Sequence, residues 1–481
     1  MKEYKLFVQK IGLVGLTNIL VAISSIILLP ILTKCFSTSD YGIWVQINTT
    51  VTLIPYIATL GLPYTMVRFL SAEKDKEKIK EGFYSIASIV LVSTLIVSLL
   101  LFLFSKDIAF ALFNGDTNIF ILVSIIVLFA CLNALLLNFF RTFQQMKRYS
   151  VFLLIQTYLG LILASYLAIN GFTIYIVSLG LLIANLVTFL IMILFIVYNI
   201  GFKIPNFSNI REYLSFGIPT IPGNLSYWIV DSSDRYVIGI LLGTTFVGYY
   251  NPGYTLGNII TMILAPFSLL LPSVLPEYYE KDDTKKVNVF LRYSLKYFLL
   301  IAIPSAFGLS ILSKPILMIL TTPEIAANGY IITPFIAASA IMFGIYGIIS
   351  NIFVLEKKTK FIGTLWIIAA ISNLILNIIL VPYLGIIGAA AVTLVAYVLA
   401  LGLSLFYSLK LFKFDFDIYS VLKSIISSII MSFAIILISP DGILNIIISI
   451  VVGFIIYSIS LISIKGIEKN EIYFFKNLLK I

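Results

Sequence analysis

The chain has 481 residues, of which 60% are hydrophobic and only 11% charged, and its mean hydropathy is +1.08. Soluble domains carry about 25% charged residues, so this composition excludes the soluble globular classes. The absence of histidine excludes His-ligated zinc, His-ligated haem and catalysis by a histidine base, and two cysteines, Cys35 and Cys131, are too few for a disulfide framework.

Hydrophobic runs along the chain predict an all-α integral membrane protein with about fourteen spans and no large soluble domain. A helix needs about 20 apolar residues to cross the hydrocarbon of a bilayer, and every run reaches that length. In chain order the predicted spans are residues 12–33, 42–63, 83–105, 119–140, 149–170, 174–198, 213–242, 247–271, 293–312, 330–355, 361–381, 386–407, 419–438 and 443–464.

The net charge of +10 follows the predicted topology. Of the 32 Lys and Arg residues, 27 lie in the amino-terminal segment and the even-numbered loops, whereas 3 lie in the odd-numbered loops. Basic residues concentrate in cytoplasmic loops, so we expect a multi-pass protein of the cell membrane with both termini in the cytoplasm. We expect contact between these charges and anionic membrane lipids, and no nucleic-acid partner.

A weak internal repeat appears at an offset of 206 residues, which relates Asn18 to Asn224 and Gly42 to Gly248. Six spans separate the partners, so the two copies share one orientation, as in transporters built from parallel repeats. The repeat predicts an amino-terminal lobe with spans 1–6 at residues 1–200, a cytoplasmic linker at 201–212, a second lobe with spans 7–12 at 213–410, and spans 13 and 14 with a cytoplasmic tail at 411–481. A substrate is then expected between the two lobes.

The seventh predicted span contains the acidic residues that lie inside a span, Asp231 and Asp234, next to Arg235. A charge in hydrocarbon costs at least about 2.5 kcal/mol, so this trio is a candidate site. Asp231 and Arg235 are four residues apart and can meet on one helix face. Arg235 is either a contact for an anionic group of the cargo or half of a structural ion pair, and either aspartate is a candidate carrier of H+ or Na+.

Further candidates in the spans each have two interpretations. Pro219 and Pro222 are either a hinge for gating or ordinary prolines of a first helical turn. The repeat-related Asn18 and Asn224 either line a cavity or form hydrogen bonds between helices.

Two residues at span ends also have a functional and a structural interpretation. Tyr250 either contacts a sugar or belongs to an aromatic belt at the interface. Arg68 either anchors the second span or receives a lipid phosphate at the cytoplasmic side. Metal-ligand clusters, phosphate loops and nucleophile elbows are missing from the sequence, so we predict no metal site, no cofactor and no catalytic residue, and expect the chain not to be an enzyme.

Three segments resemble a known family: ILLPILTKCFSTSDYGIW at residues 27–44, GLPYTMVRFLSA at 61–72, and SFGIPTIPGN at 215–224 followed by DSSDRYVIGILLGTTFVGYYNPGYTLGNI at 231–259. With them the chain resembles the polysaccharide (O-antigen type) flippases of the multidrug/oligosaccharidyl-lipid/polysaccharide (MOP) exporter superfamily. The resemblance implies a two-lobed helical transporter of the MATE/flippase type. Its residue matches nominate Asp234 and Arg235 in the cavity and Arg68 at the cytoplasmic gate.

The same resemblance implies a function. Such proteins move a polyprenyl-pyrophosphate-linked oligosaccharide from the cytoplasmic to the outer leaflet by alternating access, often coupled to H+ or Na+. The expected partners are the lipid-linked glycan, and a polysaccharide polymerase or glycosyltransferases. The alternative is a multidrug or cation antiporter of the same superfamily, although the first lobe has no carboxylate in the middle of a span. A membrane-embedded acyltransferase is disfavoured by the missing histidine, and a glycosyltransferase by the lack of a sizeable outer loop with carboxylates.

Overall fold

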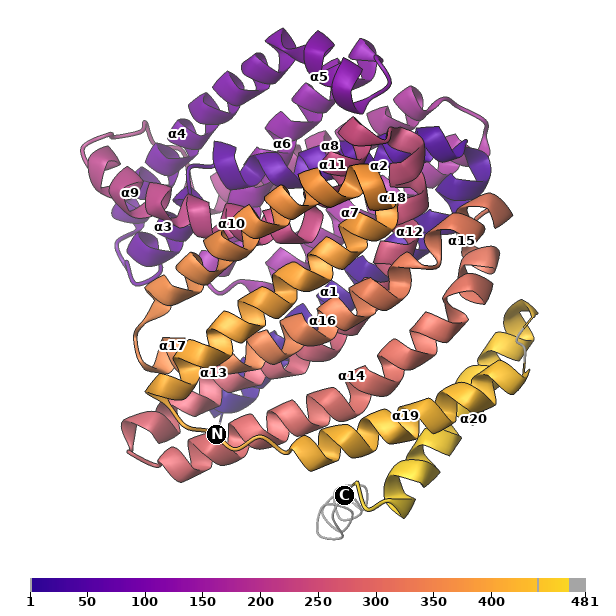
Figure 1. Ribbon diagram of the computed structural model, residues 1–481. Coiled ribbons are helices and arrows are strands. Elements are labelled where there is room, and N and C mark those ends of the chain that lie inside the picture. The colour runs from indigo at the N-terminus through magenta and orange to yellow at the C-terminus, as the bar shows by residue number, and fades with distance from the viewer. Residues whose placement is uncertain (1, 439–440, 467–481) are drawn as a thin grey trace. The chain divides into compact units, whose positions relative to one another are not determined.

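In the computed structural model, residues 2–438 and 441–466 are described, and this part of the chain forms helices and connecting turns without a β-strand (Figure 1). Hydrocarbon offers no hydrogen-bond partner to the backbone, and a helix satisfies its own backbone groups, so this apolar chain is helical almost throughout. It divides into two compact units, Met1–Gly248 and Tyr249–Ile481.

Unit 1 is organised around α6, which packs against α2, α3, α4, α5, α7 and α8. The helices of this unit are α1 (Lys2–Cys35), α2 (Thr38–Ala58), α3 (Leu62–Leu70), α4 (Lys76–Leu103), α5 (Ser105–Leu112), α6 (Thr117–Thr142), α7 (Met146–Ile169), α8 (Ile174–Ile200), α9 (Ile210–Gly217), the 3-10 turn η1 (Ile218–Thr220), α10 (Ile221–Ser232) and α11 (Asp234–Leu241). The next helix, α12 (Thr244–Asn258), begins in unit 1.

Aromatic side chains fill the core of unit 1. The ring of Phe83 on α4 lies 5.1 Å from Tyr84 and 4.9 Å from Phe139 on α6, and Phe140 stacks on Phe152 of α7 at 5.0 Å. Aromatic pairs at such distances add about 0.5–1.5 kcal/mol each beyond the area they bury. The helices that carry these rings therefore form a rigid support for α2 and α3.

The second predicted span continues beyond its expected end and bends. α2 and α3 meet at an angle of 51°, and Leu60 and Gly61 between them have positive φ angles of 53° and 68°. At Gly61 a Cβ atom would lie 2.1 Å from the backbone carbonyl oxygen of Gly217. Glycine is thus required here both by its φ angle and by the approach of α9.

The first turns of α2 and α12 make a reciprocal close contact. A Cβ atom on Gly42 would lie 1.9 Å from the carbonyl oxygen of Thr244, and one on Gly248 would lie 2.2 Å from the carbonyl oxygen of Thr38. Thr38 and Thr244, like Gly42 and Gly248, are 206 residues apart. The contact therefore has the pseudo-twofold character that two repeats at this offset produce, and Ser39 Oγ adds a 2.8 Å hydrogen bond with Thr244 Oγ1.

The segment after α8 is fastened to α4. Tyr84 donates to the carbonyl oxygen of Gly201 at 2.8 Å, and Ser85 donates to that of Asn206 at 2.6 Å. Lys203 lies 3.2 Å from Glu81. The predicted linker therefore runs along the end of α4 up to the start of α9.

In unit 2 the long helix α14 packs against α13, α15, α16, α19 and α20, and α16 packs against α18. Figure 1 shows α19 and α20 side by side, next to α14. The elements are η2 (Ile259–Leu264), α13 (Ala265–Glu280), α14 (Thr284–Leu320), α15 (Pro323–Gly329), α16 (Ile332–Ile349), α17 (Asn351–Leu355), α18 (Thr359–Leu411), α19 (Ile418–Ile438) and α20 (Gly442–Ser463).

The start of α19 is held by a carboxylate. Asp417 accepts hydrogen bonds from the backbone N–H of Ser420 at 3.1 Å and from its hydroxyl at 2.7 Å. On α14, Lys296 Nζ lies 3.7 Å and Arg292 Nη2 3.9 Å from the same carboxylate. Burial alone would raise the pKa of Asp417, but the Ser420 hydrogen bonds and the two cations outweigh it and lower that pKa below its usual value.

Eleven helices of the described chain are long and apolar enough to cross a membrane, and the bent pair α2–α3 makes twelve. α18 has 53 residues and turns at Gly385, where φ is 60° and ψ is −145°, so it covers the two predicted spans 361–381 and 386–407. The predicted span 213–242 corresponds to α9–α11, which are interrupted. The multi-pass, all-helical fold is confirmed, and the total of fourteen spans stays a prediction.

The lobe boundaries predicted from the repeat also stay a prediction. The boundary between the two compact units falls after Gly248, so α9, α10 and α11 pack with the helices of residues 1–200. The repeat instead groups them with the second lobe. The compact units are defined by contacts in one conformation, whereas the lobes are defined by the sequence repeat. The two boundaries can differ, because a helix of one repeat can pack against helices of the other repeat.

Candidate functional site

The trio of charged residues lies at a break between two helices. α10 ends at Ser232, Ser233 connects, and α11 begins at Asp234. Arg235 Nη1 donates to Asp234 Oδ1 at 2.9 Å and to the backbone carbonyl oxygen of Asp231 at 2.7 Å. Asp234 is 1% exposed and Arg235 7% exposed, so this ion pair is removed from the surroundings of the protein.

The carboxylates of the trio differ in exposure. The ion-pair partner of Arg235 is Asp234, its neighbour in sequence, whose Oδ1 also accepts the backbone N–H of Arg235 at 2.9 Å. Asp231 is partly exposed and its Oδ2 accepts a hydrogen bond from the Ser232 hydroxyl at 3.0 Å. A single charged cluster predicted from the sequence is thus a buried pair with a more accessible carboxylate beside it.

Helix α2 supports this break from one side. Gln46 Nε2 donates to the carbonyl oxygen of Arg235 at 2.7 Å, and Gly239 gives it room, since a Cβ there would lie 2.1 Å from the same nitrogen. Tyr236 donates to Thr50 Oγ1 at 2.8 Å. These contacts fasten the first turn of α11 to α2.

A polar stripe runs along α10 and comprises Asn224, Tyr227 and Asp231; we call it the α10 stripe. The three residues are partly exposed. Tyr64 of α3, which is 50% exposed, donates to Asn224 Oδ1 at 3.2 Å, and Tyr56 and Tyr227 lie close enough to Asp231 to interact with its charge. The stripe combines hydroxyl, amide and carboxylate groups with aromatic faces.

Sequence reasoning found Asn224 and Asp231 of this stripe and missed Tyr227, as well as the neighbouring Tyr56, Tyr64 and Gln46. Asn224, Tyr227 and Asp231 follow one another at intervals of three and four residues, which places them on one helix face, so this spacing was available as a signal. Tyr56 and Tyr64 lie on either side of the α2–α3 bend, and no pattern along the sequence relates them to α10. Gln46 was also missed, although an amide inside an apolar span calls for a partner.

The predicted hinge prolines lie where the helical path changes. Pro219 is in the 3-10 turn η1, and Pro222 is in the first turn of α10. Both are exposed. They occupy a helix start, where proline costs little because the first N–H groups have no acceptor within the helix. This placement is compatible with both interpretations of these prolines, and their role as a hinge stays a prediction.

Three other predicted residues belong to other elements than the ion pair. Asn18 is an exposed residue of α1, and Arg68 is an exposed residue of the last turn of α3. Tyr250 belongs to unit 2, is completely buried, and has its ring 5.8 Å from that of Tyr254. Within the described part of the chain, no hydrogen bond or ion pair joins Asn18 or Arg68 to Asp234 or Arg235.

Cysteine chemistry plays no part in these contacts, since Cys35 and Cys131 are free thiols. In residues 2–438 and 441–466, no group of three or more Cys, Asp or Glu side chains gathers in a way that could hold a metal ion.

Comparisons with known proteins agree with this all-helical architecture. The family model described as polysaccharide biosynthesis protein matches residues 7–274, more than half of the chain, and the MatE family model matches residues 219–381. Among solved structures, the fold is similar to a lipid II flippase MurJ in an inward closed conformation, with a TM-score of 0.76, 20% identity, and coverage of 96% of this chain and 99% of the other. It is also similar to an inward-facing multidrug resistance MATE family transporter of the MOP superfamily, with a TM-score of 0.65, 14% identity, and coverage of 82% and 97%.

Curated relatives match over shorter stretches. The probable low-salt glycan biosynthesis flippase Agl15 of Haloferax volcanii is 24% identical over 285 residues, which is 58% of this chain and 59% of the relative. The lipid II flippase MurJ of Thermosipho africanus is 32% identical over 205 residues, which is 41% and 42%. The chain matches less than two thirds of the length of each of these relatives. With more than half of its length matched by one family model, the chain belongs to the polysaccharide biosynthesis protein family, and it has the fold of MOP-superfamily transporters.

Proposed function

We propose that this protein flips an oligosaccharide linked to polyprenyl pyrophosphate from the cytoplasmic to the outer leaflet by alternating access. The observation that carries the proposal is the partly exposed α10 stripe with Tyr64 beside it. The names of two relatives, a lipid II flippase and a probable glycan biosynthesis flippase, support it.

The chemistry of the stripe suits a glycan head group. Sugar hydroxyls need both donors and acceptors. Asn224 donates to the Thr220 carbonyl oxygen and accepts from Tyr64, and its amide has a second N–H and a second lone pair for a sugar, whereas the Asp231 carboxylate accepts only. The rings of Tyr64 and Tyr227 add apolar faces with a polar tip. These are binding interactions without a bond that forms or breaks, so the proposed function is that of a transporter rather than an enzyme, while the lipid tail of the cargo stays in the bilayer.

Coupling to H+ or Na+ is assigned to Asp231 within this proposal. A carboxylate that exchanges a cation during transport has to be reached by that cation, and Asp231 is partly exposed whereas Asp234 is 1% exposed. Asp234 already neutralises Arg235. The distribution of basic residues supports an orientation with both termini in the cytoplasm. In this proposal glycosyltransferases make the lipid-linked glycan on the cytoplasmic side, and a polymerase receives it on the other side of the membrane.

Reconstitution in liposomes tests the proposal. A fluorescent lipid-linked oligosaccharide is added to the bilayer, and its movement between leaflets is followed with a membrane-impermeant quencher. We expect faster translocation in liposomes that contain the protein, and a loss with Asp231→Asn and Tyr227→Ala variants that keep the unfolding stability of the wild type. Equal translocation with and without the protein would refute the flippase function.

The second candidate is a multidrug or cation antiporter, which the MatE match over residues 219–381 favours. An antiporter exchanges a soluble organic cation for H+ or Na+ across the membrane. The Asp231 carboxylate and the tyrosine rings near it also suit an organic cation. Uptake of an organic cation by the same liposomes, driven by a proton or sodium gradient and without glycan translocation, would select this function instead.

A further inference from the structure

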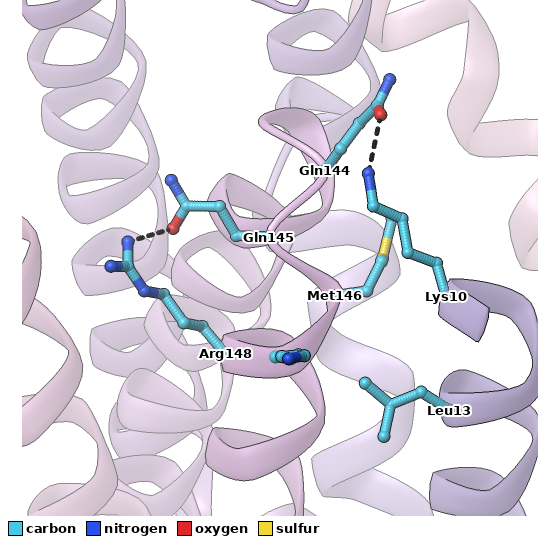
Figure 2. Close-up of a pocket in the computed structure, with 7 residues that line it drawn as sticks. Lys10, Leu13, Gln144, Gln145, Met146 and Arg148 are labelled. Atoms are coloured by element: carbon cyan, nitrogen blue, oxygen red, sulfur yellow. Dashed lines mark hydrogen bonds between the residues drawn. The ribbon is translucent and has the colours of Figure 1, made fainter. Parts of the chain in front are cut away.

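Two cavities flank the turn between α6 and α7, away from the α10 stripe. The first has a volume of about 330 Å³ and is lined by Lys10, Leu13, Gln144, Gln145, Met146, Lys147 and Arg148 (Figure 2). The second, of about 470 Å³, has Lys76 and Lys80 as its charged lining residues. In the second cavity Lys80 is paired with Glu77 at 2.7 Å, whereas the lining of the first contains three basic residues and no acidic one.

The polar side chains that line the first cavity have free hydrogen-bond donors rather than free acceptors. Lys10 Nζ donates to Gln144 Oε1 at 3.2 Å, and Arg148 Nη1 donates to Gln145 Oε1 at 2.7 Å, as Figure 2 shows. Both glutamines therefore use their acceptor oxygens on cations, which leaves their Nε2 groups without an acceptor in the described part of the chain. Lysine, arginine and these amide nitrogens can only donate.

The backbone adds to this excess of donors. Lys147 and Arg148 lie in the first turn of α7, which contains no acidic residue, and Gln145 makes no side-chain cap. Basic residues at a helix start are unfavourable because the helix dipole is positive there. An anion in the cavity would compensate both the dipole and the side-chain charges.

Apolar surface begins one turn away from these charges on both helices. On α1, Leu13 lines the cavity and Leu16 beyond it is 54% exposed; on α7, Val151 is four residues after Lys147 and 53% exposed. α1 and α7 pack along each other, and Tyr158 of α7 donates to the carbonyl oxygen of Leu20 at 3.1 Å. Leu16 and Val151 follow the lining residues Leu13 and Lys147 by three and four residues and so lie on the same helix faces, which places exposed apolar surface next to the cationic cavity.

We propose that this cavity binds the phosphate of an anionic membrane phospholipid, whose acyl chains follow Leu13, Leu16 and Val151. A phosphate has only acceptor oxygens and matches a lining of donors. The exposed apolar side chains next to the cavity favour a lipid over a soluble phosphate. The proposal is independent of the transport function. It gives Lys10, Lys147 and Gln144 a role in anchoring the protein to the leaflet on the side of the membrane where most of its basic residues are expected.

Native mass spectrometry of the detergent-solubilised full chain tests this site. The chain is titrated with phosphatidylglycerol, with phosphatidylcholine, and with inorganic phosphate, and the bound lipid is counted. We expect phosphatidylglycerol to bind more tightly than phosphatidylcholine. In the double variant Lys10→Gln/Lys147→Gln we expect its affinity to fall about thirtyfold, which is the scale for two basic residues near an anionic surface.

Matched variants separate the site from general charge. Lys357→Gln/Lys358→Gln removes the same charge from the turn before α18 and should change the affinity less than about twofold, whereas Lys10→Arg/Lys147→Arg should retain it. Gln144→Glu, which keeps the side-chain shape, should abolish the tight site. Equal binding of both lipids, or equal losses in the two double glutamine variants, would overturn the proposal. Displacement of phosphatidylglycerol by millimolar inorganic phosphate would overturn the lipid as the occupant.

Discussion

The reciprocal contact between the first turns of α2 and α12 allows a sharp test of the structure. In Gly42→Ala the new methyl group would lie 1.9 Å from the backbone carbonyl oxygen of Thr244, and in Gly248→Ala 2.2 Å from that of Thr38. A normal contact needs at least 3.4 Å. A backbone oxygen cannot rotate away, so each substitution must push the two helices apart.

The expected cost follows from this geometry. Overpacking a close contact costs about 1–3 kcal/mol, and a rigid backbone partner places these sites near the upper end. Alanine also stabilises a helix by about 1 kcal/mol relative to glycine. Gly363→Ala is the matched control, because Gly363 lies in α18 and a Cβ there would meet no described atom within 4 Å. We therefore expect Gly42→Ala to be about 3 kcal/mol less stable than Gly363→Ala.

Denaturation in mixed micelles, followed by tryptophan fluorescence, measures these free energies of unfolding. Gly248→Ala should cost about as much as Gly42→Ala. The double variant should cost less than the sum of the two, since the first substitution already separates the helices and the second then meets less resistance. Stability of Gly42→Ala equal to that of the Gly363→Ala control, or full additivity of Gly42→Ala and Gly248→Ala, would refute the reciprocal contact.

Other predictions use the same denaturation measurement. Asp234→Asn should lower the unfolding free energy by about 3 kcal/mol, because it removes the carboxylate that neutralises buried Arg235, whereas Asp231→Asn should cost less than about 1 kcal/mol; equal costs would contradict the difference in burial. Gly385→Ala should cost about 1–3 kcal/mol, because its φ and ψ lie in a region that is essentially limited to glycine, and an unchanged stability would place the kink elsewhere. The pKa of Asp417 is lowered in the folded state, so its ionised carboxylate stabilises the fold. This stabilisation is complete when the pH is above the pKa of Asp417 in the unfolded chain, and it is lost as the pH falls through the pKa of Asp417 in the folded chain. Stability should therefore fall more steeply below about pH 4 in the wild type than in Asp417→Asn, and parallel pH curves would contradict it.

The regions that could be predicted from the sequence are those governed by composition along the chain. Apolar runs and the alternation of basic loops predicted the spans, and every predicted span falls on a helix or a broken helix of the structure, although two of them share the single element α18. The repeat offset relates Gly42 to Gly248 before any coordinates are known. Both signals depend only on the position of a residue in the chain, because the membrane acts on each span in the same way.

Contacts that depend on helix breaks could not be predicted in this way. The i, i+4 spacing of Asp231 and Arg235 assumes one continuous helix, whereas the structure separates α10 from α11 at Ser233 and pairs Arg235 with Asp234. Ser233 itself is neither a proline nor a glycine, so nothing local indicates the break. It is supported from α2 by Gln46, which lies 189 residues away in the chain from the carbonyl group that it binds.

This arrangement constrains how Arg235 can act on a cargo. Arg235 is 7% exposed and its guanidinium donates to Asp234 and to the backbone of Asp231, so a pyrophosphate can reach it only after a local rearrangement. Asp231 and the tyrosines around it are reachable without such a movement. If Arg235 binds the cargo, Arg235→Gln should reduce translocation by more than its loss of stability explains. If the pair only holds the break, Arg235→Gln should lose activity in proportion to folded protein, and a stabilising substitution elsewhere should restore both together.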